Sequence, residues 1–117
     1  MKSFSEKPIL QNLAESVELV ANRTHVILCT MISGSQPVFF EWSKNGQKIS
    51  KSDQYKLVIE ESFSALTLKG LNENDSGTYT CLAKNAFGQD QTSTRLLIKG
   101  ILSVFLAKKW RSYLDSI

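Results

Sequence analysis

The stretch Asp75-Ser76-Gly77-Thr78-Tyr79-Thr80-Cys81 decides the fold of this chain. Its alternation predicts a strand that begins near Thr78 and buries Tyr79 and Cys81 on one side. Asp75 suits the preceding turn because its short side chain can cap backbone amides, and Gly77 permits a backbone conformation that a side chain would oppose. The sequence therefore predicts a tight turn that leads into a core strand.

The only other cysteine is Cys29, far earlier in the chain. A metal site usually needs clustered Cys and His ligands, which two distant cysteines and one histidine cannot supply. A disulfide that closes so long a loop would remove about 4 kcal/mol of entropy from the unfolded chain, and it persists only in an oxidising compartment. The spacing alone leaves a second possibility, two buried free thiols in a reducing compartment.

Length and composition limit the classes of protein that the chain can represent. Its 117 residues suffice for one compact domain, and a composition that is 42% hydrophobic and 21% charged excludes collagen-like and disordered classes. The net charge of +3 is concentrated in the last residues, where Lys108, Lys109 and Arg111 outnumber Asp115. Because the rest of the chain is close to neutral, it lacks the basic stripe of a nucleic-acid partner, and no such partner is expected.

Short alternating runs separated by turn signals fill the first 99 residues and predict about seven or eight strands. Asn45-Gly46 predicts a tight hairpin turn, and residues 9–19 predict an irregular edge segment behind Pro8. The other expected strands cover residues 24–32, 38–44, 55–59, 65–69, 78–84 and 92–99. This pattern favours an all-β sandwich of two antiparallel sheets. The period places these side chains inside: His25, Ile27, Cys29, Met31, Phe40, Trp42, Leu66, Leu68, Tyr79, Cys81 and Ala83.

The order of Cys29, Trp42 and the stretch 75–81 resembles the signature of the immunoglobulin fold over residues 6–99. Two segments are similar to its I-set subtype, Trp42-Ser43-Lys44-Asn45-Gly46 and Cys81-Leu82-Ala83-Lys84-Asn85-Ala86-Phe87-Gly88. The resemblance implies one disulfide, Cys29–Cys81, that pins the two sheets together. It also implies a core signature formed by Trp42, Leu68, Asp75, Gly77 and Tyr79. Residues 1–5 are then an N-terminal extension and residues 100–117 a C-terminal tail.

Within the subtype, Gly34 and Pro37 between Cys29 and Trp42 and the ending Leu96-Leu97-Ile98 are similar to the Down syndrome cell adhesion molecule (Dscam) family. Among the members of that family, the sequence pattern resembles the shortened arthropod members. That family implies homophilic pairing of immunoglobulin domains in neuronal self-recognition or immune recognition. We therefore expect an extracellular domain excised from a single-pass membrane glycoprotein. No apolar signal segment follows Met1, and an intracellular structural module of muscle or cytoskeletal type, with reduced cysteines, is the alternative.

Catalytic chemistry would have to use His25, the only histidine, which the strand pattern favours as a structural residue. No glycine-rich phosphate loop is present, so we expect no enzyme activity, cofactor, metal or small-molecule substrate. Two sequons, Asn22-Arg23-Thr24 and Asn74-Asp75-Ser76, make Asn22 and Asn74 candidate glycosylation sites.

The outward side chains of the strand that carries Cys29 are uncharged, which is unusual for a purely solvated face. An apolar centre with a charged rim is typical of a protein interface. The candidate homophilic interface comprises Val26, Leu28, Lys56, Val58, Glu60 and Thr67. A two-fold contact could set Lys56 of one copy against Glu60 of another. The alternatives are an ordinary strand surface and a heterophilic interface on the opposite sheet, formed by Phe39, Glu41, Leu82, Lys84, Arg95 and Leu97.

The tail departs from the strand pattern. Spacings of three and four residues would place one set of apolar side chains on a single helix face: Leu102, Leu106, Trp110, Tyr113 and Ile117. A basic amphipathic helix of this kind can lie on a membrane surface. The interpretation we favour from the sequence is an extension that is either foreign to the domain or poorly ordered.

Overall fold

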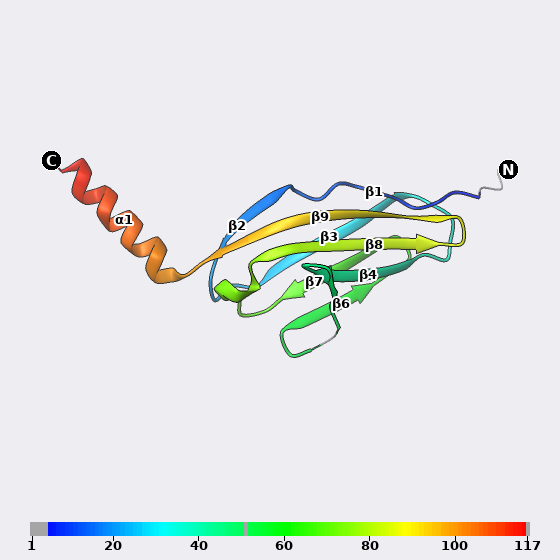
Figure 1. The fold of residues 1–117 in the computed structure, drawn as a ribbon, viewed down its shortest axis with the longest axis horizontal. Coiled ribbons are helices and arrows are strands. Elements are labelled where there is room, and N and C mark those ends of the chain that lie inside the picture. Colours follow the sequence, from blue (N-terminus) through cyan, green and yellow to red (C-terminus); the bar gives the residue numbers. More distant parts are fainter. Residues whose placement is uncertain (1–4, 51, 117) are drawn as a thin grey trace.

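The computed structural model describes residues 5–50 and 52–116. A strand-rich body is followed by a helix that extends away from one end of it (Figure 1). The elements, in chain order, are β1 (Ile9–Leu10), β2 (Ser16–Val20), β3 (His25–Ser33), β4 (Phe39–Lys44), β5 (Gln47–Lys48), β6 (Tyr55–Ile59), β7 (Phe63–Leu68), the 3-10 turn η1 (Glu73–Asp75), β8 (Gly77–Asn85), β9 (Gly88–Lys99) and α1 (Ile101–Asp115).

The strands form two sheets, in the orders β1-β3-β7-β6 and β2-β9-β8-β4-β5. This arrangement confirms the immunoglobulin-like sandwich that the sequence predicted. The expectation of purely antiparallel pairing is wrong at one place, because β2 runs parallel to β9, with Ser16 beside Arg95 and Val20 beside Lys99. The predicted hairpin turn at Asn45-Gly46 joins β4 to β5, and both residues have the positive φ that such a turn requires.

The segment predicted as one irregular edge strand, residues 9–19, is divided between the sheets. Leu10 of β1 pairs with Met31 of β3 in the first sheet. The Leu10 amide also donates to the Asp90 carboxylate at 2.8 Å, and the Leu13 amide donates to the Thr92 hydroxyl at 2.9 Å, both on β9 of the second sheet. These side-chain acceptors bond the segment to the second sheet before β2 pairs with β9, so the chain can change sheets there without leaving these amides unpaired.

The core lies between the sheets and contains the predicted inward residues of β4, β7 and β8 together with Ile27 and Cys29 of β3. Met31 packs against this core but is only partly buried, and His25, also predicted inside, is not part of it. Cys29 and Cys81 are bonded to each other, with their Cα atoms 6.4 Å apart, and link β3 to β8 across the sandwich. Trp42 is 1% exposed, and its indole nitrogen donates to the Ser64 hydroxyl at 2.8 Å. His25 is half-buried, and burial lowers the pKa of its imidazole, which agrees with a structural role for this side chain.

The corner at residues 72–81 is closed by hydrogen bonds to Asp75. The Tyr79 hydroxyl donates to the Asp75 carbonyl oxygen at 2.5 Å. The Asp75 carboxylate accepts from the Asn72 amide at 2.9 Å and from the Gln54 side chain at 2.5 Å. Burial raises the pKa of Tyr79, so its hydroxyl remains a donor at neutral pH. Gly77 has a φ of +155°, and a Cβ there would lie 2.9 Å from the Asn45 side-chain oxygen, which explains why glycine occupies this position.

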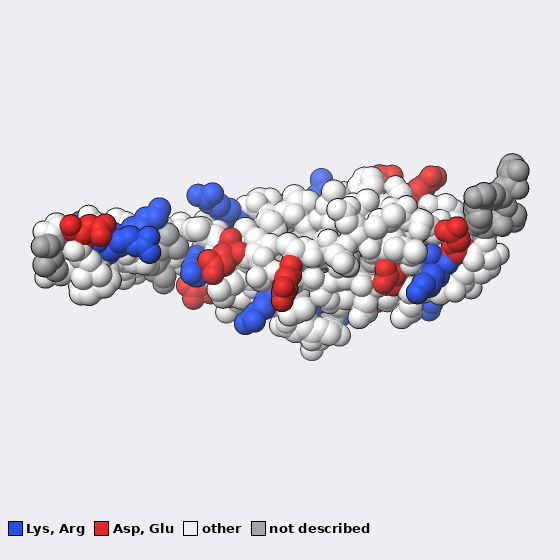
Figure 2. Space-filling view, turned by 90° about the horizontal axis from the view of Figure 1, so that it is seen from above, with Lys and Arg blue, Asp and Glu red and all other residues white. Residues whose placement is uncertain are grey.

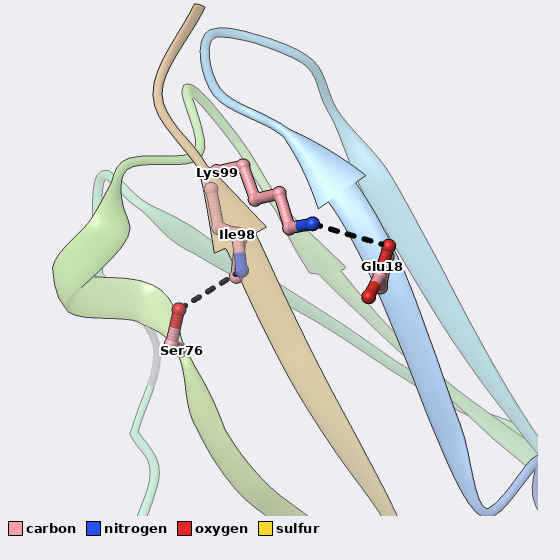
Figure 3. A network of polar contacts seen from close by, with 4 residues as sticks. All are labelled: Glu18, Ser76, Ile98 and Lys99. Carbon is pink, nitrogen blue, oxygen red and sulfur yellow. Dashed lines mark hydrogen bonds and ion pairs between the residues drawn. The ribbon is translucent and has the colours of Figure 1, made fainter. Parts of the chain in front are cut away.

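Two polar contacts tie the corner and β2 to the end of β9 (Figure 3). The Ile98 amide donates to the Ser76 hydroxyl at 2.9 Å. On the other side of β9, the Lys99 ammonium lies 3.5 Å from the Glu18 carboxylate of β2. The last strand of the sandwich is therefore held from both sides immediately before the chain leaves it.

The tail forms the helix α1, so the expectation of a poorly ordered extension is wrong and the spacing of its apolar residues is explained. The side chains of Leu102, Leu106, Trp110 and Tyr113 are all exposed, and the Trp110 and Tyr113 rings stack with centroids 5.4 Å apart. Ile117, predicted on the same face, lies outside the described residues. Within the described part of the chain, no helix has the length and apolar character needed to cross a membrane.

Candidate functional site

The structure brings all six residues of the predicted homophilic interface to one face, which we call the three-strand face. It is the outward side of β3, β7 and β6. The registers align two rows of side chains across the strands, Val26–Thr67–Lys56 and Leu28–Ala65–Val58. Glu60 follows β6 directly, and its amide donates to the Phe63 carbonyl oxygen of β7 at 2.9 Å, which extends the same face by one row.

Apolar side chains on the three-strand face are open to solvent. Val26 and Leu28 are 52% and 53% exposed. The cross-strand neighbours of Leu28 are Ala65 and then Val58, so this row is uncharged across three strands. Lys56 and Glu60 are exposed at the outer strand, and neither forms an ion pair within residues 5–50 and 52–116. The face thus offers an apolar row beside two charges that are available to a partner.

The opposite sheet also exposes its predicted set, but charges interrupt it. Phe39 is 69% exposed and lies across from Lys84, whereas Leu97 lies beside Glu18 of β2. Glu41 is 3.7 Å from Lys48, and its cross-strand neighbour is the half-buried Leu82. Arg95 is exposed as well. Each exposed apolar residue of this sheet therefore has a charged neighbour, unlike Leu28.

A groove that the sequence did not reveal opens between the sheets, on the side of β6. Its volume is about 470 Å³. Its lining includes Phe39 and Trp42 from β4 and Leu57 and Ile59 from β6. Strand alternation places Leu57 and Ile59 on the inner side of β6, but it cannot show that the opposing sheet stops short of covering them.

The residues that could carry chemistry have structural positions. The sulfurs of Cys29 and Cys81 are bonded to each other, and His25 lines a small apolar cavity together with Leu13 and Val17. Among the described residues, no three or more metal-binding side chains lie together as a group. Charges of both signs are interspersed over the face that Figure 2 shows.

The candidate glycosylation residues lie on exposed turns. Asn22 is exposed, with Thr24 of its sequon, and has a φ of 70°. Asn74 is exposed in η1, where its carbonyl oxygen accepts from the Lys44 ammonium at 2.6 Å. Modification of either residue stays a prediction.

The bridged sandwich with Trp42 against its core and Tyr79 at its corner defines an immunoglobulin-like module. Residues 8–98 match the immunoglobulin I-set domain family, and the chain belongs to that family. Modules of this fold typically serve as structural or binding units.

The chain is similar in sequence to titin and to a neural cell adhesion molecule. The chain is 30% identical to titin of Drosophila melanogaster over 114 residues, which is 97% of this chain and 1% of titin. It is 29% identical to neural cell adhesion molecule 1 of Bos taurus over 74% of this chain and 9% of that protein. Among solved structures, the titin I-band fragment I67-I69 superposes with a TM-score of 0.76 at 29% identity, over 80% of this chain and 33% of the fragment.

These comparisons leave the finer predictions open. The chain spans only a small part of each relative, so the activity of the whole relatives is not carried over. The match to titin leaves only a few residues uncovered and therefore reaches into α1, which the sequence had suggested to be foreign to the domain. Membership of the Dscam family and an extracellular location stay predictions, since relatives include both titin and an adhesion molecule.

Proposed function

We propose that this chain is the recognition module of a cell-surface adhesion protein and that its three-strand face binds a second copy. The observation that carries the proposal is the uncharged row Leu28–Ala65–Val58, which is exposed at Leu28 and half-buried at the other two positions. An isologous contact needs a patch that complements itself. The face meets this need because it combines an apolar centre with one exposed cation, Lys56, and one exposed anion, Glu60.

An extracellular location is supported by two further observations. The Cys29–Cys81 bridge would be maintained in an oxidising compartment. Similarity to a neural cell adhesion molecule covers 74% of the chain. The parent protein would then carry this module at a cell surface, anchored by segments beyond these 117 residues.

Sedimentation analysis of the purified protein tests the face. Leu28→Lys should weaken self-association by at least about tenfold, because it places a cation in the uncharged row and desolvates it on contact. The matched control is Leu97→Lys, an exposed leucine on the opposite sheet, which should leave association unchanged. Association that is lost in Leu97→Lys and kept in Leu28→Lys would contradict the three-strand face and assign self-association to the opposite sheet.

An intracellular structural module is the second candidate, and the match to titin over 97% of the chain favours it. Under this alternative the two cysteines would be reduced in the native compartment. A thiol titration of the protein isolated without reductant from its own tissue separates the cases. Two titratable thiols would contradict the adhesion proposal, whereas none would support it.

A further inference from the structure

Strand β6 is an open edge of the first sheet, because β7 is its only ladder partner among residues 5–50 and 52–116. The even-numbered residues point their backbone groups toward β7. The Glu60 amide donates to Phe63 at 2.9 Å, and the Gln54 carbonyl accepts from the Lys69 amide at 3.0 Å. Backbone groups alternate in direction along a strand. The N–H and C=O groups of Leu57 and Ile59 therefore point away from the sheet.

The neighbouring odd-numbered position is already used within the chain. The Tyr55 amide donates to the Ser52 hydroxyl at 3.2 Å, and its carbonyl oxygen accepts from the Ser52 amide at 3.3 Å. Leu57 and Ile59 are thus the two residues of β6 that present a free ladder edge. An unpaired edge of this kind is a template for another strand.

We propose that β6 pairs antiparallel with β6 of a second copy, in a two-fold register centred on Val58. This contact goes beyond the three-strand face, because it is made by the backbone edge and joins two first sheets side by side. Leu57 of each copy would face Ile59 of the other in a hydrogen-bonded pair, with four backbone hydrogen bonds across the axis. The uncharged row Leu28–Ala65–Val58 of each copy would stay on the outward side of the joined sheet, whereas Lys56 and Glu60 would be engaged by the edge contact.

Two constraints select this register. Only residues whose backbone N–H and C=O groups point away from β7 can exchange hydrogen bonds with the second copy. An odd-numbered residue of one copy must therefore lie opposite an odd-numbered residue of the other. Among the registers that satisfy this condition, the one centred on Val58 sets Lys56 of each copy opposite Glu60 of the other. Opposite charges across a strand pair are favourable and like charges are not. A lysine on an edge strand usually opposes strand addition, and here Glu60 of the partner compensates it.

The groove beside β6 supplies apolar area for the same contact. Ile59 is 55% exposed at its mouth, and Leu57 lies further in, with Phe39 and Trp42 on the opposite side. In the proposed pair, Ile59 of the second copy comes to lie beside Leu57, on the inner side of the joined sheet. It would cover the mouth of the groove and bury apolar surface in addition to the hydrogen bonds.

The test uses the full chain with Leu28→Lys, so that the three-strand face cannot contribute. Sedimentation equilibrium up to about 1 mM protein should still detect dimers. Adding Ile59→Pro should weaken them by at least about tenfold, because proline removes the amide that would donate to the second copy. The fold should tolerate the change, since this amide points to solvent and not to β7. The control Ile59→Val keeps that amide and should keep the dimer. Thermal unfolding checks that each variant is folded.

A charge exchange tests the register without altering the backbone. In the same background, Lys56→Glu and Glu60→Lys should each be monomeric, because each places like charges across the axis twice. Their equimolar mixture should form heterodimers, since every pair of positions 56 and 60 is then complementary. This recovery would also keep the proposal testable if Ile59→Pro did not fold.

Different results would contradict the edge pairing and the proposed function. A monomeric Leu28→Lys protein would overturn the edge pairing and leave the three-strand face as the contact. Unchanged dimers in Leu28→Lys with Ile59→Pro, or a mixture that stays monomeric, would overturn it as well. A monomeric Ile59→Pro protein with an intact face would instead contradict the proposed function.

Discussion

The corner at residues 72–81 and the edge strand β6 differ in whether their polar groups are hydrogen-bonded within the chain. At the corner, both carboxylate oxygens of Asp75 and its carbonyl oxygen accept hydrogen bonds from within the chain. On β6, the outward backbone groups of Leu57 and Ile59 have no ladder partner in the part of the chain that the structure describes. The two regions are nevertheless adjacent, since Gln54 immediately before β6 donates to Asp75. A closed network stabilises the fold, and the open edge that it positions is free to bind.

The largest change in stability is expected from the core that supports both regions. Trp42→Ala should lower the free energy of unfolding by about 3–5 kcal/mol, because it leaves a cavity and removes the donor to Ser64. Chemical denaturation measures this loss. Phe39→Ala, on the same strand but exposed, is the control and should change stability by no more than about 0.5 kcal/mol. Equal losses in the two variants would contradict the assigned core.

A single hydrogen bond should account for the next largest effect. Tyr79→Phe removes the hydroxyl that donates to the Asp75 carbonyl oxygen and leaves that buried acceptor unpaired. We expect a loss of about 1–3 kcal/mol in unfolding free energy. Tyr113→Phe on the exposed face of α1 should leave the unfolding midpoint unchanged. A Tyr79→Phe protein as stable as the wild type would show that the corner is held by Asp75 alone.

A change in the three-strand face should alter self-association strongly and stability only weakly. Val58→Glu adds an anion to the three-strand face and sets two carboxylates opposite each other at the proposed axis, so self-association should disappear in sedimentation velocity. Its effect on unfolding should stay near or below about 1 kcal/mol, because Val58 is only half-buried. A protein that unfolds easily after this change would mean that β6 contributes to stability as the corner does.

The smallest effect concerns pH. Burial lowers the pKa of His25 below its ordinary value of 6.5, so the unfolded chain binds more protons than the folded chain just below that pH. The stabilisation is complete above pH 6.5 and declines as the pH falls through the lowered pKa. Unfolding midpoints between about pH 7.5 and about pH 5.5 should decrease in the wild type and stay flatter in His25→Gln. Identical pH profiles would exclude His25 as the cause.

Most of the fold followed from a few residues whose roles are local. Asn45-Gly46 forms the hairpin turn, and Asp75, Gly77 and Tyr79 form the corner, because each is suited to one backbone geometry wherever it occurs. The division of residues 9–19 between two sheets was not predictable, since it depends on Asp90 and Thr92 from the far end of the chain. The parallel pairing of β2 was not predictable for the same reason, since its partner β9 is also distant in the sequence.

The sequence by itself determined which side chains share a face, since alternation along a strand is a local property of the backbone. That is why Val26, Leu28, Lys56, Val58, Glu60 and Thr67 were found together. Only the tertiary structure decided that Leu28 has uncharged neighbours on two strands, that β6 is an open edge and that a groove lies beside it. These features depend on register and on where each sheet ends, which arise from contacts between distant segments.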